Sequence, residues 1–122
     1  MIKNFSVYND RCPSHNVLEK ISDKWSILII SILLQKTLRF GELKREISGI
    51  SPKMLTQSLN KLERLGLIFR CPFPVLPMKV EYSLTTLGKE LGTILKLLTA
   101  WTEKNIEAIM FAEHQSVPPH GY

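Results

Sequence analysis

The chain has 122 residues, which is enough for one compact domain and too few for two of ordinary size. Hydrophobic residues make up 44% and charged residues 22%, a balance that excludes wholesale disorder and a fibrous protein. Lysine and arginine outnumber aspartate and glutamate by 16 to 11, so the net charge of +5 favours a polyanionic partner.

The sequence predicts a cytoplasmic protein with no membrane association. Its longest apolar stretch, 25–34, is about half of the roughly 20 residues that a bilayer requires, so it predicts a buried helix. The N-terminal residues show no apolar run before a small-residue cleavage site. Cys12 and Cys71 match neither a disulfide framework nor a zinc-ligand spacing, so we expect free thiols, no metal and no cofactor.

No repeat, low-complexity tract or linker divides the chain, which indicates one domain over 12–113. We expect residues 1–11 to be an N-terminal extension and residues 114–122 to be a flexible tail.

Two helices are predicted in the first third of the domain. Pro13 suits a first helical turn, and the apolar pattern that follows predicts a helix over 13–21. Ser22 or Asp23 can cap a second helix that includes 26–35. Because this helix is apolar around most of its circumference, we expect it to form the core.

A short extended link, 37–39, leads to a third, short helix over 41–47. Ser51 followed by a proline is a strong helix start, since the hydroxyl caps the helix and the proline has no N–H to satisfy. A fourth helix is therefore predicted over 52–65, with Gly66 ending it.

A β-hairpin is predicted after the fourth helix. Residues 67–71 alternate weakly as in a strand, and residues 79–84 form the second strand. The segment 72–77 contains three prolines, which cannot donate to a strand ladder, so we expect it to be the connecting loop.

From Thr85 a long final helix is predicted, with a stripe of apolar residues spaced four, three, four and three apart. Such a stripe requires a partner surface. Its members are Leu87, Leu91, Ile94, Leu98 and Trp101.

This order of elements predicts a mainly α fold with a small β-wing (α+β), the winged helix-turn-helix, in which the fourth helix reads DNA. Leucines at 55, 59, 62 and 65 recur at spacings that place them inward. The opposite face is basic and rich in amides. It carries Lys53, Thr56, Gln57, Asn60, Lys61 and Arg64.

The residues of that face suit a major groove, because glutamine and asparagine can bridge an adenine edge while lysine and arginine reach guanine or phosphate. We expect contacts to base edges or neighbouring phosphates from Lys53, Thr56, Gln57 and Asn60, and contacts to the DNA backbone from Lys61 and Arg64. Ser51 is expected to cap its helix and contact phosphate. The predicted DNA-binding set comprises Ser51, Lys53, Thr56, Gln57, Asn60, Lys61, Arg64, Arg39 and Lys79.

The positive charge is concentrated in this region. Between residues 36 and 79, nine lysines and arginines stand against three glutamates, an excess of six that accounts for all of the net charge. The alternative explanation is that these charges only solvate an amphipathic helix. Lys79 can likewise contact the minor groove or phosphate, or simply protect the edge of a strand.

Four segments together resemble the HxlR family of bacterial transcription regulators, which are related to the MarR regulators. They are CP at 12–13, DKW at 23–25, RFGELKREISGISPKMLTQSLNKLERLGLIFR at 39–70 and VEYSLTTLGKEL at 80–91. The resemblance implies a winged-helix homodimer formed by the first and last helices. It also implies one recognition helix in each of two successive major grooves of a pseudo-palindromic operator, about 34–36 Å apart. We expect the regulator to act as a repressor.

On this chain the implied dimer surface is apolar. It would include Val17, Leu91, Ile94, Leu98, Trp101, Ile106 and Ile109. The alternative is that the stripe of the last helix covers only its own domain. A pocket for a small-molecule or electrophile effector between the dimer helices and the DNA-binding lobe stays open.

The resemblance also draws attention to Cys12, because some members sense oxidants or electrophiles through a cysteine just before the first helix. A helix N-terminus lowers a thiol pKa, and Arg11, His15 or Lys20 could add to this effect. The alternative is a small residue with no regulatory role, which is the favoured explanation for Cys71.

Two other classes of function are alternatives to a DNA-binding protein. No nucleophile, base and carboxylate set and no phosphate-binding glycine loop is present, so no enzyme is predicted. A pure protein-interaction module is the second alternative, because winged helices also bind proteins. Steep salt dependence of DNA binding would distinguish a reader from such a module.

Overall fold

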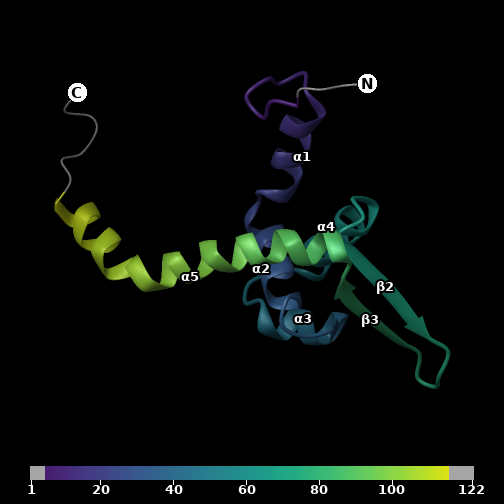
Figure 1. The fold of residues 1–122 in the computed structure, drawn as a ribbon. Coiled ribbons are helices and arrows are strands. Elements are labelled where there is room, and N and C mark those ends of the chain that lie inside the picture. Colours follow the sequence, from purple (N-terminus) through teal and green to yellow (C-terminus); the bar gives the residue numbers. More distant parts are fainter. Residues whose placement is uncertain (1–4, 116–122) are drawn as a thin grey trace.

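The computed structural model describes residues 5–115, which form five helices and one small sheet. Figure 1 shows α1 to α4 and the sheet gathered in one body, with α5 crossing it and extending well beyond it. In chain order the elements are α1 (Pro13–Ile21), α2 (Lys24–Leu33), β1 (Leu38–Arg39), α3 (Phe40–Glu46), α4 (Pro52–Arg64), β2 (Ile68–Phe73), β3 (Lys79–Leu84) and α5 (Thr86–Gln115).

The predicted helix starts are confirmed by their caps. Asp23 accepts the backbone N–H of Ser26 at 3.0 Å and so begins α2. Ser51 accepts the N–H of Met54 at 3.0 Å at the start of α4. Gly66 follows α4 with φ of +75°, the left-handed conformation expected of a glycine that ends a helix.

The core forms around α2, as its apolar sequence predicts. Ile29 and Ile30 are completely buried, and α5 packs against this helix. From the other elements, Leu43 of α3 and the inward leucines of α4, among them Leu55 and Leu62, complete the same cluster. The core therefore holds the exposed face of α4 on a rigid base.

The sheet is antiparallel with strand order β1-β3-β2, and its second strand is longer than predicted. Assigning Pro72 and Phe73 to the loop was wrong, because they pair with Val80 and Lys79. The Thr85 N–H donates to the Leu67 carbonyl oxygen at 3.0 Å. Because hydrogen-bonded and non-hydrogen-bonded pairs alternate along an antiparallel ladder, Pro72 and Val80 form a non-hydrogen-bonded pair, and the backbone nitrogen of Pro72 faces away from β3. A proline at such a position of an outer strand removes no ladder bond.

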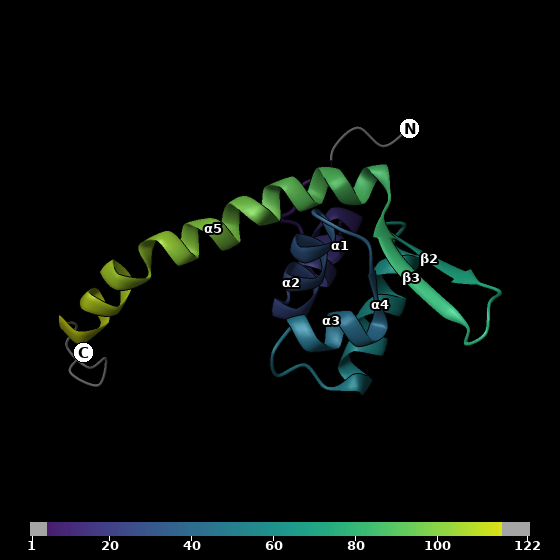
Figure 2. The ribbon, with the colours of Figure 1, turned by 90° about the horizontal axis from the view of Figure 1, so that it is seen from below.

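The last helix, α5, is 30 residues long and spans about 45 Å. Its first turns lie on the body, whereas its C-terminal half projects away from it in both views (Figures 1 and 2). Residues 114 and 115, which were predicted to belong to the tail, are helical, and the rest of that tail lies outside the described residues.

Within 5–115 no helix is long and apolar enough to cross a membrane.

Candidate nucleic-acid interface

The fourth helix presents two chemically different faces. Leu55, Leu59 and Leu62 are buried, and the predicted reading side chains lie on the opposite side. The exposed members are Lys53, Thr56, Gln57, Asn60 and Arg64. Within the described residues these five side chains form no hydrogen bond or ion pair, so their polar groups are available to a ligand.

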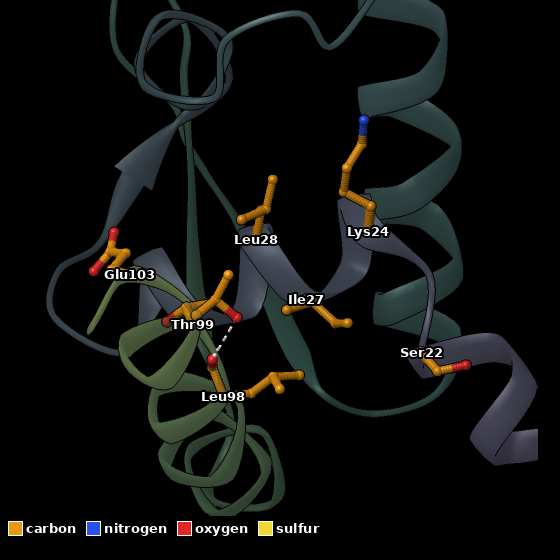
Figure 3. Close-up of a pocket in the computed structure, with 8 residues that line it drawn as sticks. Ser22, Lys24, Ile27, Leu28, Leu98, Thr99 and Glu103 are labelled. Atoms are coloured by element: carbon orange, nitrogen blue, oxygen red, sulfur yellow. Dashed lines mark hydrogen bonds between the residues drawn. The ribbon is translucent and has the colours of Figure 1, made fainter. Parts of the chain in front are cut away.

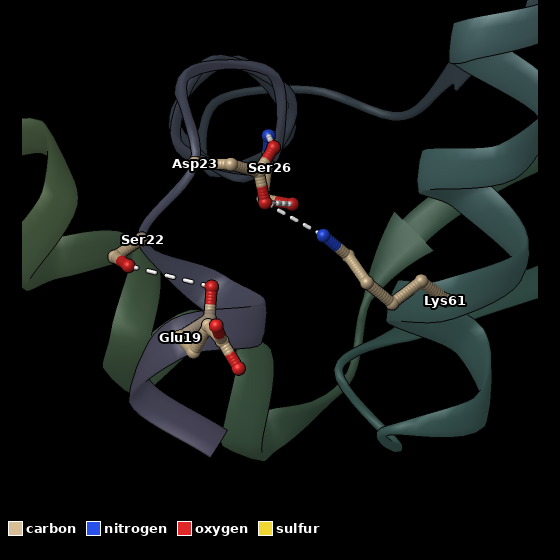
Figure 4. A network of polar contacts seen from close by, with 5 residues as sticks. All are labelled: Glu19, Ser22, Asp23, Ser26 and Lys61. Carbon is tan, nitrogen blue, oxygen red and sulfur yellow. Dashed lines mark hydrogen bonds and ion pairs between the residues drawn. The ribbon is translucent and has the colours of Figure 1, made fainter. Parts of the chain in front are cut away.

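Lys61 departs from the rest of the predicted reading set. Its Nζ atom lies 2.6 Å from Oδ2 of Asp23, and its side chain is only 25% exposed. Figure 4 shows it reaching from α4 toward the start of α2. In this arrangement Lys61 joins two elements of the protein instead of facing outward with Gln57 and Asn60.

The carboxylate of Asp23 accepts three hydrogen bonds. Oδ1 accepts the N–H of Ser26 at 3.0 Å, and Oδ2 accepts the Ser26 hydroxyl at 2.8 Å besides Lys61. Partial burial raises the pKa of Asp23, but the bonds from Lys61 and Ser26 outweigh it and hold the pKa below its ordinary value. One carboxylate therefore both caps α2 and positions α4.

A depression of about 560 Å³ lies beside this ion pair, between the start of α2 and the exposed side of α4. It brings three predicted reading residues, Gln57, Lys61 and Arg64, onto one concave surface. The lining residues are Asp23, Trp25, Met54, Gln57, Ser58, Lys61 and Arg64.

Arg39 and Ser51 lie at the N-termini of the two helices of the helix-turn-helix pair. The Arg39 backbone N–H donates to Glu42 Oε1 at 2.8 Å, and its Nε lies 3.7 Å from the same oxygen. The backbone N–H of Arg39 is the main cause that lowers the pKa of Glu42. Ser51 uses its hydroxyl as the cap of α4 and is itself exposed.

Lys79 lies on the β2–β3 hairpin, which forms the wing. It is the first residue of β3, is exposed, and pairs with Phe73 of β2. Since β2 packs on α4, the wing lies next to the predicted reading helix.

Most residues of the predicted dimer surface are exposed and apolar. Ile94, Leu98 and Trp101 on α5 and Val17 on α1 are each more than 40% exposed, whereas Leu91 is partly buried. The structure brings the two helices together at an apolar hollow of about 420 Å³. It is lined by Val17, Ile21, Leu65, Leu67, Leu87, Glu90, Leu91 and Ile94.

A second hollow, of about 500 Å³, lies between α2 and α5. Figure 3 shows Ile27 and Leu28 of α2 and Leu98 of α5 around it, with Lys24 and Glu103 at its margin. Because it adjoins the exposed stripe of α5, it lies where the predicted dimer helix meets the DNA-binding lobe.

Cys12 is the N-cap residue of α1, and it is only 8% exposed. Its Sγ lies 3.2 Å from Ser14 Oγ, and this hydrogen bond is the largest cause that lowers the pKa of the thiol, ahead of burial, which raises it. Cys71 is exposed on β2. The segment before α1 folds back, with His15 Nδ1 2.7 Å from Val7 O.

The helices α3 and α4 pack on the core, and the antiparallel hairpin β2–β3 lies beside them. The exposed face of α4 is basic and rich in amides. This arrangement defines a winged helix-turn-helix, the class of DNA-binding proteins predicted from the sequence. Residues 20–110 match the model of the family described as HxlR-like helix-turn-helix. The chain belongs to this family of DNA-binding transcriptional regulators, which confirms the resemblance drawn from its motifs.

Relatives and solved structures agree with this assignment. The HTH-type transcriptional regulator YtfH of Escherichia coli (strain K12) is 39% identical over 109 residues, covering 89% of this chain and 86% of that protein. The structure of the transcriptional regulator YtfH from Salmonella typhimurium is similar, with a TM-score of 0.86 and 37% identity. The match covers 92% of this chain and all of the other.

Two further similar structures have names that bear on sensing. The oxidized form of the redox regulator HypR matches with a TM-score of 0.71 and 35% identity, covering 77% of this chain and 97% of that one. Diamide-treated YodB from B. subtilis matches with a TM-score of 0.65 and 33% identity, covering 76% of this chain and 93% of that one.

Proposed function

We propose that two copies of this chain form a repressor that binds a pseudo-palindromic operator in double-stranded DNA, with one α4 in each of two successive major grooves. The observation that carries the proposal is the division of α4 into a buried leucine face and an exposed face of unpaired amides and cations. In this proposal the contacts to base edges or neighbouring phosphates come from Lys53, Thr56, Gln57 and Asn60, and the contacts to the DNA backbone come from Ser51, Arg64, Arg39 and Lys79.

Lys61 takes a different part in this proposal. In the free protein it holds α4 against the start of α2 through Asp23. It reaches a phosphate only when that ion pair opens, so its main role is to position the reading helix.

The experiment starts from duplexes that the wild-type protein enriches from a random-sequence library. Binding should weaken steeply between low and physiological salt. The logarithm of the association constant should fall with the logarithm of the salt concentration with a slope of about −0.9 per phosphate contact. Gln57→Ala should weaken binding by roughly 5- to 150-fold and relax specificity, and Lys53→Ala should also weaken it. Lys96→Ala removes the same charge from exposed α5 and serves as the matched control.

Repression is tested by transcription in vitro from a promoter that overlaps the enriched site. Transcription should fall as wild-type protein is added and should persist with Gln57→Ala. A flat salt dependence with no enriched sequence would contradict the DNA-reading proposal and favour a protein-interaction module.

The dimer is proposed to form through α1 and α5, with Val17, Leu91, Ile94, Leu98, Trp101, Ile106 and Ile109 at the interface. The support is the exposed apolar area on both helices and the hollow that they share. Two α4 helices related by a two-fold axis would then match a palindromic site.

We also propose that Cys12 makes the repressor responsive to oxidants or electrophiles. A lowered thiol pKa increases the reactive thiolate fraction, and the α1 N-cap lies beside the proposed dimer surface. Modification there would tilt the subunits and change the separation of the reading helices.

The sensing proposal is tested in a Cys71→Ser background, because exposed Cys71 would otherwise react first. Diamide or benzoquinone should lower operator affinity in this protein and leave affinity unchanged when Cys12 is also replaced by serine. Unchanged operator affinity with Cys12 fully modified would contradict the sensing proposal and would leave the DNA-reading proposal standing.

A further inference from the structure

One buried hydroxyl group has no partner in the part of the chain that the structure describes. Ser31 on α2 is 6% exposed, and its Oγ forms no hydrogen bond with any residue in 5–115. A serine within a helix can donate to the carbonyl four residues earlier, but Ser31 does not. Buried polar atoms without a partner are rare, because they lose their bonds to water and gain none. This hydroxyl therefore indicates a polar group that comes from outside the chain.

The hydroxyl lines a hollow of about 410 Å³ between α2, the end of α3 and α5, which we call the Ser31 hollow. Its apolar wall comes from Leu28 and Ile32 of α2 and from buried Ile47, which follows α3. Thr99 and Glu103 line it from α5, and with Leu28 they also line the hollow of Figure 3, so the two hollows adjoin. None of the described residues that line the Ser31 hollow belongs to the proposed dimer surface or to the reading face.

The charged side chains around the Ser31 hollow favour a cation. Two carboxylates, Glu46 and Glu103, line it together with one ammonium group, that of Lys96. Glu46 is paired with Lys36 at 3.0 Å, whereas the carboxylate of Glu103 forms no ion pair or hydrogen bond within 5–115. Lys96 lies seven residues before Glu103, about 10 Å away along the helix axis. Glu103 is therefore the acceptor that is left for an ammonium group.

We propose that the Ser31 hollow binds a small primary amine whose apolar body carries a hydroxyl group. The ligand hydroxyl bonds to Ser31, the apolar body packs against Leu28 and Ile32, and the ammonium group bonds to Glu103. Apolar walls with a few polar groups at fixed places are the usual composition of a small-molecule site.

The position of the hollow links the ligand to the reading helix. A bound amine touches α5 on one side and, on the other, Ile47 and Ser48 in the turn that precedes α4. Occupancy therefore favours one arrangement of α5 relative to this turn, and with it one separation of the two reading helices. This regulatory step rests on the proposed DNA-reading function, whereas binding of the amine does not.

The binding test uses the whole chain without DNA. Tyramine is the probe, and phenethylamine, which lacks only the hydroxyl, is the matched comparison. Titration of isotope-labelled protein followed by NMR gives both dissociation constants. Tyramine should bind wild type about 10-fold more tightly, because its hydroxyl pairs with a buried group that otherwise has no partner. Ser31→Ala should abolish this preference and leave the affinity for phenethylamine unchanged.

The charge of the ligand is tested on α5. Glu103→Gln should weaken tyramine binding about 2- to 5-fold, as expected for an exposed ion pair. Glu107→Gln makes the same change one turn further along α5, outside the hollow, and should leave binding unchanged. The corresponding hydroxyphenyl carboxylate, with the opposite charge on the same skeleton, should bind more weakly than tyramine.

The stability of Ser31→Ala tests the premise directly. Because the substitution removes a buried hydroxyl that has no partner, the free energy of unfolding should equal or exceed that of wild type. A loss of stability would show that the hydroxyl is already bonded in the free protein and would overturn the proposal. Equal affinities of wild type for tyramine and phenethylamine, or no binding of either at millimolar concentration, would overturn it as well.

The regulatory step has its own outcome. Saturating tyramine should change the affinity of wild type for an enriched duplex and should have no effect on Glu103→Gln at the same concentration if that variant is left unoccupied. Tyramine binding without any change in duplex affinity overturns the regulatory step alone. Absence of any enriched duplex overturns the DNA-reading function and leaves the amine site standing.

Discussion

Lys61 on the reading helix and Asp23 at the start of α2 form an ion pair of 2.6 Å across 38 positions of the chain. The pair ties α4 to the start of α2, and the same carboxylate is fixed by two hydrogen bonds from Ser26. Lys61 is therefore paired within the protein, whereas the other predicted reading residues of α4 are exposed.

Lys61→Ala should lower the free energy of unfolding by about 1 kcal/mol, since the pair is partly exposed and leaves an acceptor without its cation. Chemical denaturation measures this change. Lys53→Ala is the control, because Lys53 is exposed and unpaired, and its stability should stay within about 0.5 kcal/mol of wild type. Equal losses in both variants would contradict a structural role for Lys61.

Asp23→Ser should separate the two roles of the carboxylate. Serine retains the cap of α2 but cannot form the ion pair, so it should match Lys61→Ala in stability. Asp23→Ala removes both the α2 cap and the ion pair with Lys61, so it should be destabilised by about 2 kcal/mol. A serine variant as unstable as the alanine variant would show that the cap contributes nothing.

Stability should depend on pH through Asp23. Its pKa is lowered in the folded protein from an ordinary value of 3.8, so its contribution is complete above that value and is lost as the pH falls toward the folded pKa. Denaturation between pH 2 and 6 measures the effect. Asp23→Asn should flatten the profile below pH 4, and an unchanged acid limb would assign the dependence to other carboxylates such as Glu42.

Gly88→Ala should destabilise the fold. A Cβ atom at position 88 would overlap the carbonyl oxygen of Leu67, which is backbone and cannot move aside. We expect a loss of about 3 kcal/mol in thermal or chemical unfolding. Gly41→Ala is the matched control, because its Cβ meets only the Arg45 guanidinium at 3.6 Å and alanine favours the helix.

Trp101→Asp should shift the protein from dimer to monomer, because it would bury a charge in the proposed apolar interface. Sedimentation velocity measures the change at micromolar concentration. Lys104→Ala, on exposed α5, should leave the assembly unchanged. A Trp101→Asp protein that remains dimeric would place the interface elsewhere.

The helix boundaries of the reading lobe could be predicted because their signals are local. Ser51, Pro52 and Gly66 each specify a helix end by their own hydrogen-bonding or conformational chemistry. The leucine period of α4 likewise predicted the buried positions of Leu55, Leu59 and Leu62. These features depend on neighbours within a few residues, which is the range that a sequence pattern describes.

Other features depended on tertiary structure and could not be predicted. Lys61 has the same spacing as the exposed residues of α4, and only the fold shows that Asp23 lies beside it. The length of β2 depends on which side of the ladder Pro72 occupies, and that follows from register. In the sequence Gly88 is only a residue with low helix propensity, and the fold shows that the Leu67 carbonyl lies against it.

The projecting half of α5 has a consequence for how much protein a cell must make. Residues 100–115 are exposed apart from partly covered Asn105, and an isolated helix of that length is marginal in water. If two copies associate through α5 as proposed, formation of this helix and association of the copies are one linked equilibrium. The dimer population would then grow with the square of the monomer concentration, and operator occupancy would respond to gene dosage more sharply than it would for a single-chain binder.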